Sequence, residues 1–177
     1  RMGRGGDQIP FLEKGYPAIR FSVAVEDYDH QHQDLREEDG VTYGDTVDEM
    51  DFAYLAKVTQ LNVRALSRLA RTPMPPAATI EAAVSTDATI SWNAIAGAAS
   101  YVVWQRRTDE STWMPEPVLR IPAQGADESG PAPFYSAILP GVRGDDWLFG
   151  VSACSEADQC SPVSSAVPAG AFAPIAK

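Results

Sequence analysis

The order of apolar and polar positions changes near Thr72. Before it, the chain has a continuous apolar run and a long periodic segment, whereas after it short alternating runs are separated by Gly, Pro, Ser and Asp. Residues 71–78 read Arg-Thr-Pro-Met-Pro-Pro-Ala-Ala, and proline stops helices and favours a stiff, extended connection. We therefore predict a first domain over residues 1–71, a Pro-rich linker over 72–78 and a second domain over 79–171.

In the first half, the pattern predicts two helices and a strand. Residues 9–15 have Pro near the start and Gly at the end, as in a short helix. The apolar, β-branched run 17–25 is typical of a mostly buried strand, so the order of elements predicts an α/β layer. After a cap at Asp48 or Asp51, apolar residues recur every three or four positions, which predicts an amphipathic helix; they are Phe52, Leu55, Val58, Leu61, Ala65 or Leu66, and Leu69.

In the second half, short alternating runs predict strands separated by turns, an arrangement typical of an all-β sandwich. Aromatic residues in these strands could form a platform that stacks against sugars, but alternate aromatics in sandwich strands usually belong to the core, and we expect this of Trp92. The predicted strands are residues 80–84, 88–92, 101–106, 118–121, 135–139, 147–153 and 161–166.

The negative charge is concentrated in one stretch of the chain. The formal net charge is -10, and residues 26–51 contain 11 acidic residues and one basic residue, Arg36. Without a basic patch, the chain is not expected to bind nucleic acid or an anionic membrane surface. It also lacks the run of about 18 apolar residues that a membrane-spanning helix needs.

Both histidines lie in this acidic stretch. His30 and His32 follow the C-terminal end of the predicted strand, an edge where ligands bind in open α/β sheets. Imidazole and carboxylate donors together suit zinc, manganese or a similar divalent ion, although two histidines in a loop can also be ordinary solvated residues. A calcium loop is not expected, because the regular Asp-x-Asp-x-Asp-Gly pattern is absent from residues 26–51.

Several motifs of the first half resemble one family. They are the segment Gly5-Gly6-Asp7-Gln8 with Phe11, the turn Gly15-x-Pro17-Ala18-Ile19, the spacing His30-x-x-x-Asp34, and a helix opened by Asp51-Phe52. Together they resemble the C-terminal part of the co-catalytic zinc exopeptidases typified by aminopeptidase Y and bacterial leucyl aminopeptidase. The resemblance covers residues 1 to about 71 and implies an α/β fold, part of a three-layer zinc-exopeptidase-like domain.

The resemblance also implies a cofactor and a set of site residues. In that family two zinc ions activate a water molecule, and the last ligand is the histidine four residues before an aspartate. By that match His30 is the zinc ligand, with His32 as the alternative. Asp34, Asp29 and Asp7 would not bind the metal but would help to orient the residues that do. The other ligands of the family lie upstream of the matched region, so no catalytic residue is assigned here.

The resemblance implies that the chain is the C-terminal part of a larger zinc aminopeptidase that acts on peptide or protein substrates. The first residues carry charge with no apolar stretch behind them, unlike a signal peptide. We expect an N-terminal part of the catalytic domain to be missing, with one of the family's metal ligands present here. We therefore expect the fragment alone to be inactive.

The second half resembles a fibronectin type III domain. The resemblance is carried by Ile90-Ser91-Trp92, by Gly97-Ala98-x-x-Tyr101-x-Val103, and by Leu139-Pro140-Gly141 followed by Trp147-x-Phe149-x-Val151. It implies an all-β fibronectin type III-like sandwich. It also leaves a second function open, in which the chain is a non-catalytic module that binds a protein or glycan surface.

The two cysteines, Cys154 and Cys160, flank a predicted turn. Their symmetric placement could bring them face to face across the last hairpin, where a disulfide would limit the unfolded chain. Because disulfides persist in oxidising compartments, a bridge would indicate a periplasmic or secreted protein. The alternative is a pair of reduced, unrelated thiols.

Overall fold

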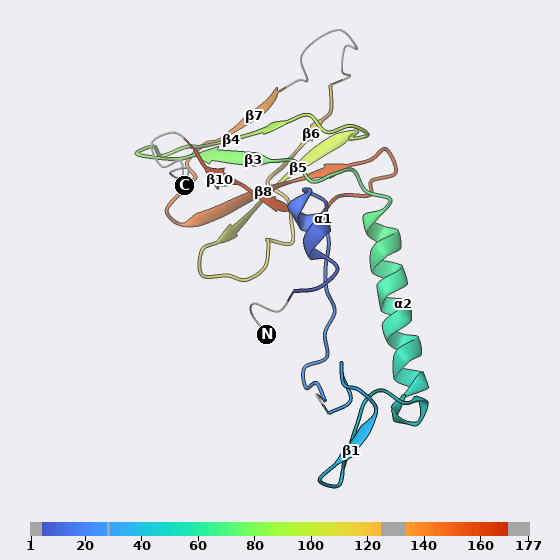
Figure 1. Ribbon diagram of the computed structural model, residues 1–177. Coiled ribbons are helices and arrows are strands. Elements are labelled where there is room, and N and C mark those ends of the chain that lie inside the picture. The colour runs from blue at the N-terminus through green and yellow to red at the C-terminus, as the bar shows by residue number, and fades with distance from the viewer. Residues whose placement is uncertain (1–4, 28, 125–133, 170–177) are drawn as a thin grey trace. The chain divides into compact units, whose positions relative to one another are not determined.

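A computed structural model describes residues 5–27, 29–124 and 134–169 (Figure 1). The contacts divide the chain into two compact units, Arg1–Ala70 and Arg71–Lys177. The fold is mixed α/β, with mostly sheets and few helices. The predicted domain limits at residues 1 and 171 lie outside the described residues.

The two α-helices of the first unit are where the sequence predicts them, whereas a short 3₁₀ turn was not predicted. Helix α1 spans Ile9–Glu13 with Pro10 in its first turn, and the 3₁₀ turn η1 spans Val47–Glu49. Helix α2 spans Phe52–Leu69 and begins at Asp51, whose side chain accepts a hydrogen bond from the Tyr54 backbone N–H at 2.9 Å. The cap at Asp51 is therefore confirmed, because this carboxylate satisfies a backbone donor that the first turn of the helix leaves without a partner.

The predicted strand over residues 17–25 is absent from the structure. The segment has no regular secondary structure and no strand pairing, and Phe21, Val23 and Val25 are exposed. A strand forms only when its backbone groups pair with a neighbour, and no described segment of this unit pairs with residues 17–25. The run therefore has the composition of a buried strand, but it lacks the neighbouring strand with which it would have to pair.

A β-hairpin that we did not predict lies in the acidic stretch. Strand β1, Arg36–Glu38, pairs antiparallel with β2, Val41–Tyr43. The turn between them is Asp39-Gly40, with φ of 52° and 79°, as the tight type I′ turn requires. The Asp-Gly pair was a usable sequence signal, masked by the charge of its surroundings.

The second unit consists of two four-stranded sheets. One has the strand order β10-β3-β4-β7 and the other β6-β5-β8-β9, and all neighbours are antiparallel except β10 and β3. The strands are β3 Ala78–Glu81, β4 Ala88–Asn93, β5 Ser100–Arg107, β6 Leu119–Pro122, β7 Phe134–Leu139, β8 Trp147–Cys154, β9 Ser164–Ser165 and β10 Val167–Pro168.

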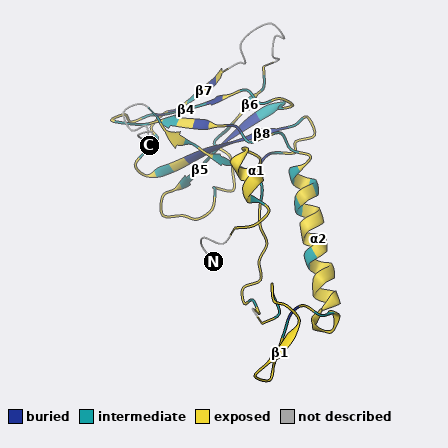
Figure 2. Ribbon diagram, viewed as in Figure 1, coloured by how far each residue is buried: buried dark blue, intermediate teal, exposed yellow. Residues whose placement is uncertain are grey.

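The two sheets of this unit share one hydrophobic core. Along β4 buried and less buried positions alternate, which turns Ile90 and Trp92 inward, and Val103 and Val151 of the other sheet join the same cluster. Figure 2 shows buried stretches along the strands of this unit, whereas α2 is mostly exposed. The ring of Trp92 stacks on Tyr135 with centroids 5.8 Å apart. The prediction that Trp92 belongs to the core is confirmed.

No helix among the described residues is long and apolar enough to cross a membrane.

Candidate metal site on the acidic loop

The imidazole of His30 is held by a backbone carbonyl. Its Nδ1 lies 3.0 Å from the oxygen of Gly44, and its side chain is 25% exposed. Because a carbonyl oxygen only accepts hydrogen bonds, Nδ1 carries the proton of this contact. In the neutral ring the lone pair is then on Nε2, the nitrogen that is available to a metal ion.

The segment around Gly44 ties the histidine loop to the end of the hairpin. Gly44 follows Tyr43, the last residue of β2, and its N–H donates to the carbonyl of Asp29 at 3.0 Å. Gly44 is buried although most residues around it are exposed. Sequence reasoning missed this residue, and the available signal was a glycine directly after a short strand.

Asp27 is the described carboxylate that faces the other side of the His30 ring. Its Oδ2 lies 3.9 Å from His30 Nε2, and its Oδ1 accepts a hydrogen bond from the Asp29 N–H at 3.0 Å. Sequence reasoning counted Asp27 among the acidic residues without assigning it a role. Its position three residues before His30 was the only signal.

These contacts raise the pKa of His30 above its ordinary value of 6.5. The largest cause is the hydrogen bond to the Gly44 carbonyl, and the charges of Asp27, Glu49 and Asp29 act in the same direction, while desolvation opposes them. A metal ion binds the neutral ring, so protons compete with it. Metal binding at His30 would therefore strengthen as the pH rises through this raised pKa.

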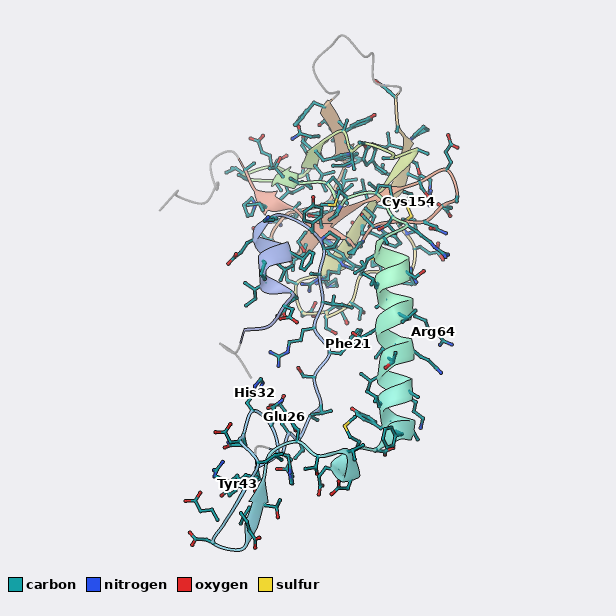
Figure 3. All side chains as sticks on the ribbon, turned by 45° about the vertical axis from the view of Figure 1, so that its right-hand side comes forward. Phe21, Glu26, His32, Tyr43, Arg64 and Cys154 are labelled. Atoms are coloured by element: carbon teal, nitrogen blue, oxygen red, sulfur yellow. A yellow bond between two sulfur atoms is a disulfide. The ribbon has the colours of Figure 1, made fainter. Side chains whose placement is uncertain are left out.

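The other site residues that the sequence suggested lie in different surroundings. Asp29 contributes its backbone to the contacts described above, whereas its side chain, Asp34 and His32 are exposed. His32, labelled in Figure 3, has a left-handed backbone with φ of 57°. The segment His32-Gln33-Asp34 also has a His-x-Asp spacing that sequence reasoning overlooked.

Asp7 lies at an apolar groove of the first unit. The groove has a volume of about 360 Å³ and runs between α1, residues 17–21 and the C-terminal half of α2. Phe11, Ile19 and Leu66 line it together with Asp7. The described contacts of His30 do not include Asp7.

The donors on the acidic loop can form only part of a zinc site. Zinc in proteins usually takes four ligands, and the described geometry offers two candidate atoms, His30 Nε2 and Asp27 Oδ2. Among the described residues, the group of three potential donors is instead Cys154, Asp158 and Cys160. This group does not suit zinc, because its two sulfur atoms form a disulfide and are not thiolates.

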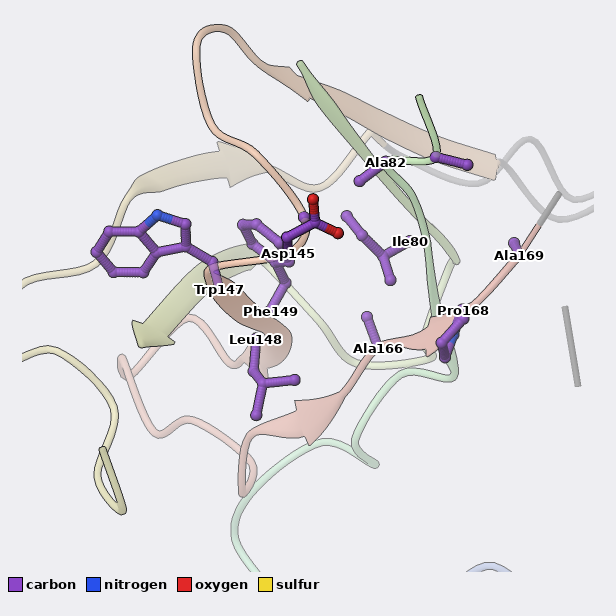
Figure 4. Close-up of a pocket in the computed structure, with 11 residues that line it drawn as sticks. Ile80, Ala82, Asp145, Trp147, Leu148, Phe149, Ala166, Pro168 and Ala169 are labelled. Atoms are coloured by element: carbon purple, nitrogen blue, oxygen red, sulfur yellow. The ribbon is translucent and has the colours of Figure 1, made fainter. Parts of the chain in front are cut away.

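The second unit has an apolar pocket of its own. Its volume is about 310 Å³, and it is lined mainly by Ile80, Trp147, Leu148, Phe149 and Pro168, with Asp145 as the acidic residue of the lining (Figure 4). Apolar walls with one carboxylate suit a ligand with apolar surface, and they do not provide the several donor atoms that a metal ion needs.

No family model matches the chain. The chain is similar to fungal proteins named probable zinc metalloproteases. It is 46% identical over 118 residues to one from Leptosphaeria maculans, covering 64% of this chain and 27% of that protein. It is 42% identical over 118 residues to one from Pyrenophora tritici-repentis, covering 64% of this chain and 24% of that protein.

A third relative matches more of the chain. The probable zinc metalloprotease of Phaeosphaeria nodorum is 29% identical over 177 residues, which cover 96% of this chain and 33% of that protein. The chain thus spans about a quarter to a third of the length of these relatives. The similarity supports a relationship to zinc metalloproteases.

Proposed function

We propose that this chain is the C-terminal part of a zinc metallopeptidase, an aminopeptidase that hydrolyses N-terminal peptide bonds. The observation that carries the proposal is His30, whose Nδ1 is fixed by Gly44 and whose Nε2 is turned toward Asp27, in a chain similar to probable zinc metalloproteases. In this proposal the first unit is part of a zinc-exopeptidase-like domain. The second unit is a fibronectin type III-like sandwich, joined through the Pro-rich segment 72–78.

Exposed apolar surface in the first unit supports the view that further chain completes it. None of the 18 residues of α2 is buried, and Phe52, Leu61 and Leu66 are 60%, 48% and 69% exposed. The groove beside Ile19 and Leu66 is apolar, and the segment 17–25 has no described strand neighbour. Apolar surface of this extent usually marks a contact, and the partner in this proposal is the N-terminal part of the same catalytic domain.

The residues of this chain have defined roles in the proposal. His30 would hold one of two zinc ions through Nε2, and the neutral imidazole would add no charge that weakens the electrophilic character of the ion. The chemistry that bound zinc would supply is the activation of water for attack on a peptide carbonyl. Asp27 adds negative charge beside the imidazole, and Asp29 holds both Asp27 and Gly44 through its backbone. The remaining ligands and the general base come from the N-terminal part.

The experiment uses the longer polypeptide that the proposal requires. We expect it to release the first residue of a peptide with a free amino terminus and not of the same peptide acetylated. A chelator should abolish the activity, and zinc should restore it. His30→Ala should abolish most activity, with His32→Ala as the matched control on the same loop. Activity that survives chelation, or His30→Ala with native turnover, would contradict the proposal.

The 177-residue chain alone should not bind two zinc ions tightly or cleave peptides, because its described residues hold too few donors in one place. Isothermal calorimetry with zinc measures this directly. A stoichiometry of two with submicromolar affinity would show that the chain contains a complete site.

A second candidate function is a binding module, and the apolar pocket around Trp147 favours it. In this alternative the sandwich engages a protein or glycan surface and the acidic half only supports it. Deleting residues 71–177 from the longer polypeptide distinguishes the two functions. If the protein is a zinc peptidase, the shortened polypeptide should keep its zinc. If it is a binding module, neither the full nor the shortened polypeptide should contain zinc.

We also propose a periplasmic or secreted location, which the Cys154–Cys160 disulfide supports because such bonds persist in oxidising compartments.

A further inference from the structure

Gly44 differs from the other groups around His30 because it acts through its backbone. The imidazole proton can reside on either ring nitrogen, and a metal ion needs the unprotonated one. The Gly44 carbonyl oxygen lies 3.0 Å from His30 Nδ1 and accepts a hydrogen bond from it, so the ring proton is on Nδ1. The position of one backbone oxygen therefore decides which nitrogen is left for a ligand.

The carbonyl is itself held in place. The Gly44 N–H donates to Asp29 O at 3.0 Å, so His30 and the residue before it both contact Gly44. Tyr43, directly before Gly44, is paired with Arg36 across the hairpin, and the Arg36 guanidinium lies 3.9 Å from the centroid of the Tyr43 ring. The hairpin thus serves as an anchor for the oxygen that contacts His30.

A side chain at position 44 would disturb this arrangement. The φ of Gly44 is +99°, a conformation that residues with a Cβ rarely adopt. A Cβ built there would lie 2.8 Å from Leu35 Cδ2 and 3.0 Å from the Leu35 Cα and N. Backbone atoms cannot move aside as the end of a flexible side chain can, so a larger residue would displace the carbonyl.

We propose that Gly44 is a positioning residue, whose carbonyl fixes His30 as the Nδ1–H tautomer and presents Nε2 to a metal ion. Backbone carbonyls that accept from the second nitrogen of a histidine are a common means of orienting a metal ligand. The purpose of this arrangement rests on the proposed zinc function. The tautomer itself does not, because it is a property of the metal-free chain.

The test is ¹⁵N NMR of the imidazole nitrogens in the metal-free 177-residue chain, at a pH well above the pKa of His30. In the wild type, Nδ1 of His30 should be protonated and Nε2 unprotonated. In Gly44→Ala, the Nε2 signal should shift toward the protonated position as the Nδ1–H tautomer is lost.

Gly40→Ala is the matched control. Gly40 also has a positive φ, +79°, but a Cβ there would meet nothing within 4 Å, and it lies in the hairpin turn rather than beside His30. It should strain the turn and leave the His30 tautomer as in the wild type.

Three results would overturn the proposal. They are a wild-type His30 protonated on Nε2, an unchanged tautomer in Gly44→Ala, and equal changes in Gly44→Ala and Gly40→Ala. If Gly44→Ala loses the hairpin signals, the wild-type tautomer decides alone. A confirmed tautomer with no zinc in the longer polypeptide would refute the proposed function and leave this inference standing.

Discussion

At the scale of single residues, Trp92 is the clearest case of a side chain that the fold of the second unit depends on. It is 1% exposed and contacts the rings of both Tyr101 and Tyr135. Trp92→Ala should destabilise this unit by about 3–5 kcal/mol, because it removes buried apolar surface and leaves a cavity. Urea unfolding followed by fluorescence of the other tryptophans measures the change.

The matched control for Trp92 is Ile138→Ala. Ile138 lies on β7 and is 65% exposed, so its truncation should change the stability by no more than about 0.5 kcal/mol. Equal losses in the two variants would mean that Trp92 does not lie in the core.

The charge state of His30 should follow its surroundings. Its pKa is raised, mainly by the hydrogen bond to Gly44, so the protonated ring is favoured in the folded state. The stabilisation from this group should be fully present below the unfolded pKa of about 6.5 and should be lost as the pH rises through the folded pKa. A proton NMR titration of His30 gives the folded value, and a midpoint at or below 6.5 would contradict the described contacts.

The sequence could indicate His30 but not the groups around it. The acidic surroundings and the spacing to Asp34 are visible in the chain, and they direct attention to this histidine. Gly44 is fourteen residues away and contacts His30 through a backbone oxygen, so the sequence does not show that the two residues meet. Asp27 is one acidic residue among 11 in its stretch, and only its distance to Nε2 distinguishes it.

At the scale of elements, the start of α2 depends on one carboxylate. Asp51→Ala should reduce the stability of this helix by about 1 kcal/mol, because the Tyr54 N–H loses its acceptor. Hydrogen exchange at Tyr54 and its neighbours measures the effect. Asp48→Ala, in the preceding 3₁₀ turn, is the control. A larger loss of helix stability in Asp48→Ala than in Asp51→Ala would contradict the assignment of the cap to Asp51.

The last hairpin of the second unit is closed by the Cys154–Cys160 disulfide. Because the loop is short, reduction should lower the stability of this unit by about 2 kcal/mol in the chain-entropy relation. Thiol counting in denaturant without reductant should find none free, and denaturation with and without reductant gives the energy. Two reactive thiols per chain would show that the bond does not form in solution.

Elements that depend on local signals were predictable, and those that depend on neighbours were not. The period of α2 and its cap are visible in its own residues, and β4 shows its inward positions by alternation. The run 17–25 has an equally strong pattern, but a strand needs a second strand, which the described chain does not provide. The β1–β2 hairpin had a signal in Asp39-Gly40, which the surrounding charge made easy to overlook.

At the scale of the whole molecule, the excess negative charge and most of the large exposed apolar residues of the described chain lie in the first unit. The acidic residues between 26 and 51 account for the net charge of -10, and three of them, Asp27, Glu49 and Asp29, act on His30 through their charge. The exposed faces of α2 and the apolar groove lie in the same unit. A metal ion at His30 would balance part of the negative charge, and further protein would cover the apolar faces. Neither the ion nor the further protein can be identified from a pattern within this chain.

The most direct test of this account is the zinc content of the longer polypeptide, measured by mass spectrometry of the metal after gel filtration. We predict two zinc ions per chain in the wild type and in His32→Ala, and a loss of about one in His30→Ala, since one ion loses a ligand. A His30→Ala protein that keeps both ions, or a wild type without zinc, would contradict it.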